Sequence, residues 1–326
     1  MRQAFAVCVL MFVLFPLALG NRFTKDDEKH FSDWSEPVSL GEVINSTSYD
    51  ACPTISKSGL SLYFRSNRSG NFDIYVSQRD SLEDPWEDPV PLGPTINGPS
   101  DEYCTSFSTD GHWMIFVSNR VEGAYGSQDL WISHRKDKRD DFGWEEPYNL
   151  GPLINSSGQE NGPCLFDDEA TGQTFLYFSS GRPAGISGFS GLNIWVAVAL
   201  PGEKDMFGAP TLVQELSSNF TDYQPTIRKD GLELIFASNR PGSIPTTPGG
   251  NTRYPDLWVA TRSSTLLAWD PPENLGTLVN SSAFDFHPTL SWDGTTLIFA
   301  SERGGAAVGW ADLFMCTRTK LTGPKK

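Results

Sequence analysis

The stretch DACPTISKSGLSLYFRSNRSGNFDIYVS, residues 50–77, holds most of one structural unit that the rest of the chain repeats with variations. It runs from Asp-x-x-Pro through a Ser-Gly turn and an alternating apolar run to Ser-Asn-Arg, a polar loop and Asp-Ile-Tyr-Val. Short runs of aromatic and β-branched residues between Gly, Pro, Asn and Asp are typical of β-strands joined by tight turns. One such unit cannot bury a core alone, so its repetition predicts an array of small sheets.

Two parts of this unit recur five times. A Trp-x-x-Pro segment, with Phe for Trp in one copy, begins at Trp34, Trp86, Trp144, Phe207 and Trp269. Ser-Asn-Arg, or a close variant, ends at Arg68, Arg120, Arg182, Arg240 and Arg303. The runs 62–64, 234–236 and 297–299 are apolar or aromatic at every position, which suits strands covered on both faces by neighbouring sheets. We therefore predict an all-β fold, a five-bladed β-propeller.

The two ends of the array complement each other. The chain enters it with a Trp-x-x-Pro strand at Trp34 that has no earlier unit, and the last unit ends near Leu313 to Thr317 without such a strand. Pairing these segments would complete the last blade and remove two exposed strand edges. We predict that the N-terminal strand closes the last blade; an open array with a stray first strand is the alternative.

The chain divides into four expected segments. Residues 1–20 have one early arginine, an apolar run and a small-residue end, which is typical of a cleaved signal peptide. Residues 21–33 are expected to be a flexible lead-in, residues 34–318 a single β-propeller domain, and residues 319–326 a C-terminal tail. The apolar run is shorter than the roughly 20 residues of a membrane helix, and no second such run follows. We predict a secreted or periplasmic protein without membrane insertion.

The acidic composition narrows the classes of partner. The formal net charge is -15, whereas nucleic acids and anionic membrane surfaces require compensating Lys and Arg. We expect no nucleic-acid partner, and instead a protein, a glycan or a cation. Cofactor motifs are absent from the sequence, so no cofactor is expected apart from a possible bound Ca²⁺.

Several motifs carry a family resemblance. Asp-x-x-Pro, a Ser-Asp-Gly-type turn, Phe-x-Ser-Asn-Arg-x-Gly and Asp-Leu-Trp resemble the TolB-type β-propeller repeat, which is loosely related to WD40-like repeats. The best copies are residues 222–258 and 285–314, and the resemblance, which spans nearly all of residues 34–318, implies a propeller. TolB itself is a periplasmic component of a cell-envelope complex, with six blades and an extra α/β domain. This chain departs on both counts, so TolB's partners are not implied.

One mouth of the central channel is the predicted place of a site. In an antiparallel four-stranded blade, the link into the inner strand shares a face with the link between the second and third strands. The first link carries an acid in every unit: Asp50, Glu102, Glu160, Asp222 and Asp285. The second carries the longest insertions, which present Tyr125, Phe189, Tyr254 and Trp310. Gln224 and His287 project beside the acids, at the position of Cys52 and Cys104 in other units.

The five acids have two interpretations. As ligand-binding groups, they would hold a polyhydroxylated ligand or a hard cation such as Ca²⁺, together with Gln224 and His287. As structural groups, each would accept backbone N–H bonds from its adjoining turn, which their presence in every unit favours. A zinc site is not expected, because no short ligand spacing joins the four histidines: His30, His112, His134 and His287.

Two functions are compatible with this mouth. The preferred prediction is a non-catalytic recognition or scaffold protein whose acidic, loop-bearing face binds a protein or a glycan. The alternative is a glycan-active enzyme in which Asp50, Glu102 and Glu160 imitate the carboxylates of sugar-cleaving five-bladed propellers. Hydrolysis would require a protonated acid and a second carboxylate, about 5 to 5.5 Å away for retention or about 6.5 to 9.5 Å for inversion.

Two further kinds of contact are predicted. The repeated arginines are expected to pair with acids across a hairpin: Arg68 with Asp73, Arg120 with Asp129, Arg240 with Asp256 and Arg303 with Asp312, while Arg182 faces Asn193. Cys52 and Cys104 occupy the same place in consecutive units. They either form a disulfide or remain two buried thiols.

Overall fold

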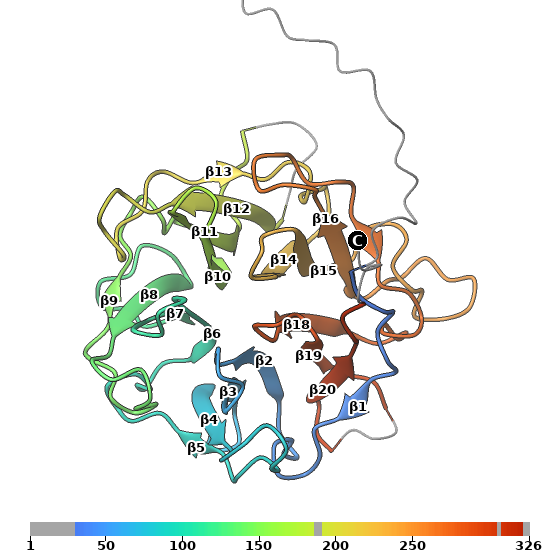
Figure 1. The fold of residues 1–326 in the computed structure, drawn as a ribbon, viewed down its shortest axis with the longest axis horizontal. Coiled ribbons are helices and arrows are strands. Elements are labelled where there is room, and N and C mark those ends of the chain that lie inside the picture. The colour runs from blue at the N-terminus through green and yellow to red at the C-terminus, as the bar shows by residue number, and fades with distance from the viewer. Residues whose placement is uncertain (1–29, 186–190, 305–307, 322–326) are drawn as a thin grey trace, which may run out of the picture.

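The computed structural model describes residues 30–185, 191–304 and 308–321. In these residues, five four-stranded antiparallel sheets surround a central channel (Figure 1). The described part contains no helix that is long and apolar enough to span a membrane. The prediction of an all-β, five-bladed propeller is confirmed, whereas the predicted signal peptide lies outside the described residues.

Each sheet forms one blade, and the blades follow the order of the chain. Blade I comprises β2 (Asp50–Ile55), β3 (Ser61–Ser66), β4 (Asp73–Gln78) and β5 (Val90–Pro91). Blade II comprises β6 (Glu102–Phe107), β7 (Trp113–Ser118), β8 (Asp129–His134) and β9 (Tyr148–Asn149). Blade III comprises β10 (Glu160–Asp168), β11 (Gln173–Ser180), β12 (Asn193–Val198) and β13 (Thr211–Leu212).

The last two blades have the same composition. Blade IV comprises β14 (Asp222–Ile227), β15 (Glu233–Ser238), β16 (Asp256–Thr261) and β17 (Glu273–Asn274). Blade V comprises β18 (Asp285–Leu290), β19 (Thr296–Ser301), β20 (Asp312–Thr317) and β1 (Val38–Ser39). The innermost strands of the five blades are β2, β6, β10, β14 and β18 (Figure 1).

The N-terminal strand completes blade V, so the ring is closed as predicted. β1 pairs antiparallel with β20, and the two strands lie side by side in Figure 1. Asn45 reinforces the junction, because its Nδ2 donates to the carbonyl of Leu313 at 3.1 Å and its Oδ1 accepts the N–H of Leu313 at 2.8 Å. Residues 30–33, which belong to the expected lead-in, also lie alongside residues 319–321.

The core lies between the blades, around their second strands. The largest side chains buried there are Tyr63, Phe64, Phe116, Phe178, Phe236 and Phe299. Fully burying such a side chain contributes about 1.5 to 3 kcal/mol of stability. The sheets are covered on both faces, which explains why the second strands lack the alternation of polar and apolar residues.

A β-bulge turns the middle of every inner strand toward the channel. The pairing register shifts after Ala51 in β2 and at the equivalent place in the other four inner strands. The third residue of each inner strand has φ between 51° and 56°, in the left-handed region: Cys52, Cys104, Gly162, Gln224 and His287. A Cβ added to Gly162 would lie 2.6 Å from Cα of Gln224, so this position has no room for a side chain. The bulges thus aim five equivalent positions at the channel axis.

Replacing Asn45 by alanine should lower the free energy of unfolding by about 1 to 3 kcal/mol, because the buried N–H of Leu313 loses its acceptor. Denaturant unfolding of the purified protein measures this change. Asn280→Ala removes the same double contact, with Leu257, at another junction and should have a similar effect. Asn251→Ala, in an exposed loop, is the control. Unchanged stability of Asn45→Ala would show that this contact does not hold the ring closed.

Candidate functional site

The five repeated acids lie on one face of the propeller, but none is exposed at the channel mouth. Each begins an inner strand, and each is 0% exposed: Asp50, Glu102, Glu160, Asp222 and Asp285. The expectation that these carboxylates rim the mouth is therefore wrong. The physical reason is that each acid is held inside its own blade by a serine and an arginine.

Blade IV illustrates this contact. Ser238 Oγ and Arg240 Nη2 each donate to Asp222 Oδ1 at 2.5 Å. The guanidinium carbon of Arg240 also lies 4.9 and 5.4 Å from the ring centres of Phe236 and Trp258. Burial raises the pKa of Asp222, and the positive charge of Arg240 opposes that rise. A carboxylate this deeply buried requires its partner, because an unpaired buried charge is strongly destabilising.

The other four blades repeat the same pair. Arg68 binds Asp50 at 2.8 Å, Arg120 binds Glu102 at 3.1 Å, Arg182 binds Glu160 at 3.3 Å, and Arg303 binds Asp285. In these blades the adjoining turn also donates a backbone N–H to the acid, from Ser46, Gly98, Ser156 and Ser281. The structural interpretation of the acids is confirmed. A catalytic or Ca²⁺-binding role for them stays a prediction that no contact among the described residues supports.

The predicted arginine pairs across the hairpin are wrong. Inner and second strands pair so that Asp222 lies opposite Ser238, which places the acid beside the arginine two residues later. The acids of the third strands instead bind their own loops: Asp129 accepts the N–H of Tyr125 and Asp256 accepts that of Ile244. Asp73 and Asp312 likewise have partners in their own loops.

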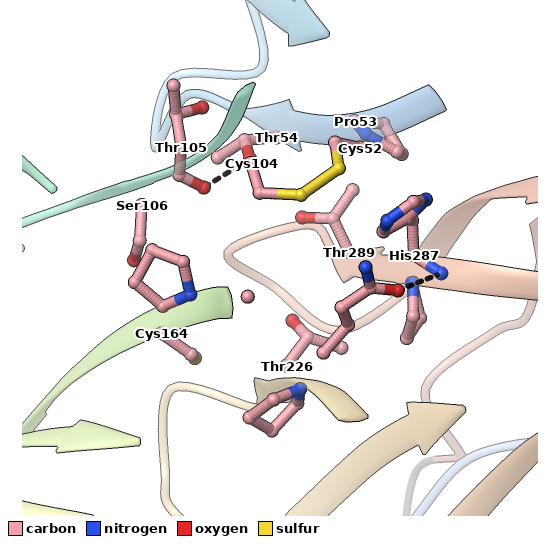
Figure 2. Close-up of a pocket in the computed structure, with 15 residues that line it drawn as sticks. Cys52, Pro53, Thr54, Cys104, Thr105, Ser106, Cys164, Thr226, His287 and Thr289 are labelled. Atoms are coloured by element: carbon pink, nitrogen blue, oxygen red, sulfur yellow. Dashed lines mark hydrogen bonds between the residues drawn. A yellow bond between two sulfur atoms is a disulfide. The ribbon is translucent and has the colours of Figure 1, made fainter. Parts of the chain in front are cut away.

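The five bulges surround a small cavity in the channel (Figure 2). The cavity there has a volume of about 60 Å³ and is lined by residues 52–54, 104–106, 162–164, 224–226 and 287–289. Cys52 and Cys104 form a disulfide with Cα atoms 4.8 Å apart, so this one of the two alternatives is confirmed. Gln224 and His287 lie beside that disulfide and not among the acids. The space suits a water molecule or an ion, and is too small for a sugar.

The mouth opposite the repeated acids opens into a larger cavity. Its volume is about 890 Å³, and its lining includes the turns 56–60 and 108–112. Lys57 and Lys229 lie 4.2 and 5.8 Å from the ring centre of Trp292. Burial raises the pKa of Asp110, but hydrogen bonds from Ser108 and His112 in its own turn together lower it by more. The net effect is a lowered pKa. This carboxyl is ionised at neutral pH and does not fit the role of a proton donor.

At the loop-bearing mouth, on the face of the repeated acids, Arg65 lies among three aromatic side chains. Its guanidinium carbon lies 4.9, 4.7 and 5.1 Å from the ring centres of Tyr49, Phe72 and Tyr103. The Nε of Arg65 is buried and has no hydrogen-bond partner among the described residues. With two nearby carboxyl groups, these residues form what we call the mouth cluster: Tyr49, Arg65, Phe72, Asp101, Tyr103 and Glu302.

Glu302 is the carboxyl of the mouth cluster whose surroundings fit a proton donor. Partial burial raises its pKa, while the residue as a whole remains exposed. None of the described residues forms a hydrogen bond or ion pair with its carboxyl group, whose charge raises the pKa values of Tyr49 and Tyr223 further. The other carboxyl groups with raised pKa values bind neighbouring groups: Asp73, Glu102, Asp222, Asp256 and Asp312.

Asp101 supplies a second carboxyl group to this mouth. Its Oδ1 accepts the N–H of Phe72 at 3.1 Å, and its Oδ2 accepts Nδ2 of Asn119 at 2.9 Å. These two bonds fix its orientation beside Tyr103, whose pKa burial raises and the charge of Asp101 raises further. Glu302 follows β19 of blade V and Asp101 precedes β6 of blade II, so the two residues come from the blades on either side of blade I.

The loops of this face add exposed aromatic side chains. Tyr125, Tyr254 and Trp310 are 49%, 39% and 81% exposed, as expected for the loop insertions. Tyr254 stacks on Phe284, with ring centres 4.2 Å apart. Phe189, the fourth expected aromatic residue, lies outside the described residues.

Sequence reasoning missed Arg65 and Glu302, although both depart from the repeat. At the place of Glu302, three blades have an asparagine whose Oδ1 accepts a backbone N–H of the adjoining link: Asn67, Asn119 and Asn239. At the place of Arg65, the other blades have small or apolar residues: Val117, Ser179, Ala237 and Ala300. Arg65 and Glu302 each place a charged side chain at a position where the other blades have an uncharged residue. This departure from the repeat is the signal that could have located the site.

Comparisons with known proteins give matches in structure and not in sequence. No protein-family model matches the chain, and no curated protein matches it. A thermostable family-43 glycoside hydrolase has a TM-score of 0.56 at 13% identity, over 86% of this chain and 91% of its own. For an endo-arabinase from Bacteroides thetaiotaomicron the TM-score is 0.53 at 16% identity, over 90% and 100% of the two chains. The chain shares their fold.

A third match is an α-L-arabinofuranosidase from Podospora anserina, solved with cellotriose, with a TM-score of 0.51 at 13% identity over 90% of this chain and 99% of its own. Two predictions are corrected. The TolB-type resemblance was right about the propeller, but these matching structures are glycoside hydrolases. The prediction of a non-catalytic recognition or scaffold protein is wrong: the acids of its binding face are buried in their blades, and the matching propellers are enzymes.

Replacing Arg240 by alanine should lower the free energy of unfolding by about 3 to 5 kcal/mol, because Asp222 is left as a buried, unpaired carboxylate. Thermal unfolding followed by circular dichroism measures the loss. Arg139→Ala is the matched control, since Arg139 is 84% exposed in its side chain and pairs with the exposed Asp137. If Arg240→Ala unfolds at the same temperature as Arg139→Ala, the buried pair is not the stabilising contact.

Proposed function

We propose that the chain is a glycan-active enzyme that hydrolyses glycosidic bonds at the loop-bearing mouth. The observation that carries this proposal is Glu302, an exposed carboxyl group with a raised pKa whose charge acts on Tyr49 and Tyr223 at the loop-bearing mouth, where the repeat has a structural asparagine. Perturbed carboxyl groups at a mouth are typical of catalytic sites. In this proposal the enzyme is secreted or periplasmic and acts on a glycan, with no nucleic-acid partner.

The chemistry requires two carboxyl groups with different tasks. Glu302 is the proton donor, because a raised pKa extends to higher pH the range over which a carboxylic acid keeps the proton that the leaving oxygen needs. Asp101 is the second carboxyl group, which activates a water or attacks the sugar carbon. Its two hydrogen bonds, to the N–H of Phe72 and to Asn119, support this role because they hold it in one orientation.

Arg65 and the aromatic side chains supply binding rather than proton transfer. The guanidinium group presents several N–H donors, for which sugar hydroxyls are suitable acceptors. Small-molecule sites are lined mainly by apolar and aromatic groups with a few placed polar ones. The rings of Tyr49 and Phe72, 5.7 Å apart, and the stacked pair of Tyr254 and Phe284 fit that description.

The names of the matching structures indicate the first substrates to test. They include an α-L-arabinofuranosidase, an endo-arabinase and a family-62 glycoside hydrolase solved with xylotriose. These names describe those proteins, and they favour glycans that contain arabinose or xylose as the starting panel for this one. The repeated acids Asp50, Glu102 and Glu160 have no catalytic task in this proposal, because each is neutralised within its blade.

Glu302→Gln and Asp101→Asn should each lower kcat by about 10² to 10⁴-fold, the usual contribution of general acid and base groups. Release of reducing sugar from arabinan and xylan, and of nitrophenol from aryl arabinofuranosides and xylosides, measures the activity. The wild-type rate should fall as pH rises through the raised pKa of Glu302, because the donor then loses its proton. Glu302→Gln should lose that alkaline limb.

Glu122→Gln is the matched control, since Glu122 is an exposed acid on a loop of the same face. It should retain the wild-type rate and pH profile. A wild-type protein no more active than Glu302→Gln on every substrate of the panel would refute the proposal. An active Glu302→Gln variant with an unchanged alkaline limb would place the proton donor elsewhere.

A further inference from the structure

The channel brings together three residues that can bind a metal ion, although sequence spacing gave no sign of them. One ligand atom each from Cys52, Cys104 and His287 lie within 4.8 Å of one another. All three are buried, and they come from β2, β6 and β18, the inner strands of blades I, II and V. Figure 2 shows the disulfide and His287 around the same central space.

His287 has the state and the surroundings of a metal ligand. It is 5% exposed, and its Nδ1 is buried with no hydrogen-bond partner among the described residues. Burial lowers the pKa of its imidazole well below the usual range, and the nearby charge of Arg65 lowers it further. A buried polar atom without a partner is unfavourable unless a ligand satisfies it. A neutral imidazole nitrogen is the form that binds metal ions.

The backbone prepares this arrangement in advance. Cys52, Cys104 and His287 have the same left-handed φ of 51° within their bulges, so their side chains project at equivalent places around the axis. Gln224 occupies the fourth such place, and its Oε1 accepts the N–H of His287 at 3.2 Å. The cavity of about 60 Å³ that these residues line has room for one ion and a water molecule.

We propose that Cys52, Cys104 and His287 form a zinc site that is available when the Cys52–Cys104 disulfide is reduced. A dithiol reductant supplies two electrons and two protons, is itself oxidised to a disulfide, and leaves two thiols on the protein. Zn²⁺ then displaces the two thiol protons and binds two thiolate sulfurs and one imidazole nitrogen. A water molecule or the side-chain oxygen of Gln224 completes four-coordination. Oxidation removes two of the three protein ligands, so the site is redox-gated.

The ligand chemistry selects zinc over a hard cation. Zn²⁺ binds thiolates at about 2.3 Å and imidazole at about 2.0 to 2.1 Å in a tetrahedron, which separates the ligand atoms by roughly 3.3 to 3.8 Å. The three ligand atoms lie within 4.8 Å of one another, so these separations come within reach once the Cys52–Cys104 bond is broken, the two sulfurs move apart and the side chains rotate. Two thiolates neutralise the ion, so the complex adds no net charge near Arg65. The channel lining contains no carboxylate that would favour Ca²⁺.

The zinc site would strengthen the junction at which the ring closes. β1 is continuous in the chain with β2 of blade I but joins the rest of blade V through its pairing with β20, whereas a metal held by β18, β2 and β6 ties the inner strands of blades V, I and II together at the axis. An ion that binds only the folded state stabilises it by a free energy that grows with the logarithm of the ion concentration relative to Kd. Zinc should therefore protect the reduced protein against unfolding, independently of any activity on glycans.

Cobalt substitution tests the site directly. After reduction with a phosphine and removal of oxygen, the protein should bind one equivalent of Co²⁺ and develop thiolate-to-cobalt absorption, while the oxidised protein should not. Zn²⁺ should displace the cobalt and raise the unfolding temperature of the reduced protein. The variant His287→Gln carries glutamine at its bulge, as blade IV does at Gln224, so the backbone tolerates the change. It should weaken metal binding by at least about tenfold.

Two cysteine variants separate this site from other thiols. Cys52→Ser/Cys104→Ser should abolish the absorption, whereas Cys164→Ser/Cys316→Ser, which removes the two buried free cysteines of the described residues, should leave it unchanged. Two outcomes overturn the proposal: reduced wild type that binds neither cobalt nor zinc, and equal metal binding by wild type and His287→Gln. The second comparison does not require a cysteine variant to fold, because His287→Gln keeps both cysteines. Retention of Cu⁺ with no binding of Co²⁺ or Zn²⁺ would show that zinc is the wrong ion.

Discussion

A buried carboxylate neutralised by an arginine is the contact on which each blade depends. In blade IV, Arg240 binds both Asp222 and the carbonyl of Leu216, so one guanidinium group joins the inner strand, the link before it and the loop after the second strand. Phe236 and Trp258 flank the same group and keep water away from it. Breaking such a pair costs several kcal/mol, since one charge is then left buried alone. In all five blades this contact ties the link before the inner strand to the residues that directly follow the second strand.

The same contact decides where chemistry can occur. A carboxylate that is fully buried and bonded to its own arginine has no oxygen available for a substrate, however favourably it lies in the sequence. A repeated scaffold also supplies five identical groups, whereas proton donation and nucleophilic attack require different ones. Departures from the repeat are therefore the places to examine. Glu302 gives up a structural bond that asparagine makes in three other blades, and Arg65 places a charge where the other blades have none.

The sequence was sufficient for the architecture because the architecture is repetitive. Five copies of Trp-x-x-Pro and Ser-Asn-Arg specified the number of blades, and the unmatched ends of the array specified the pairing of β1 with β20. It was insufficient for the partners of the arginines, because Asp222 and Asp256 lie at similar distances along the chain from Arg240 and strand pairing decides between them. The mouth cluster and the channel triad combine residues from different blades, which no local spacing can reveal.

The two proposed sites lie on one axis and share Arg65. Its charge acts on Tyr49 at the mouth and on His287 in the channel, so the channel and the mouth are electrostatically coupled. An unscreened divalent ion in the channel would oppose this guanidinium group in a region of low dielectric, where charges interact strongly. Two thiolates remove that repulsion, and a disulfide is likewise uncharged. Both redox states of the channel therefore leave Arg65 free to bind at the mouth, and the cysteines can alternate between disulfide and metal ligands without disturbing the proposed catalytic groups above them.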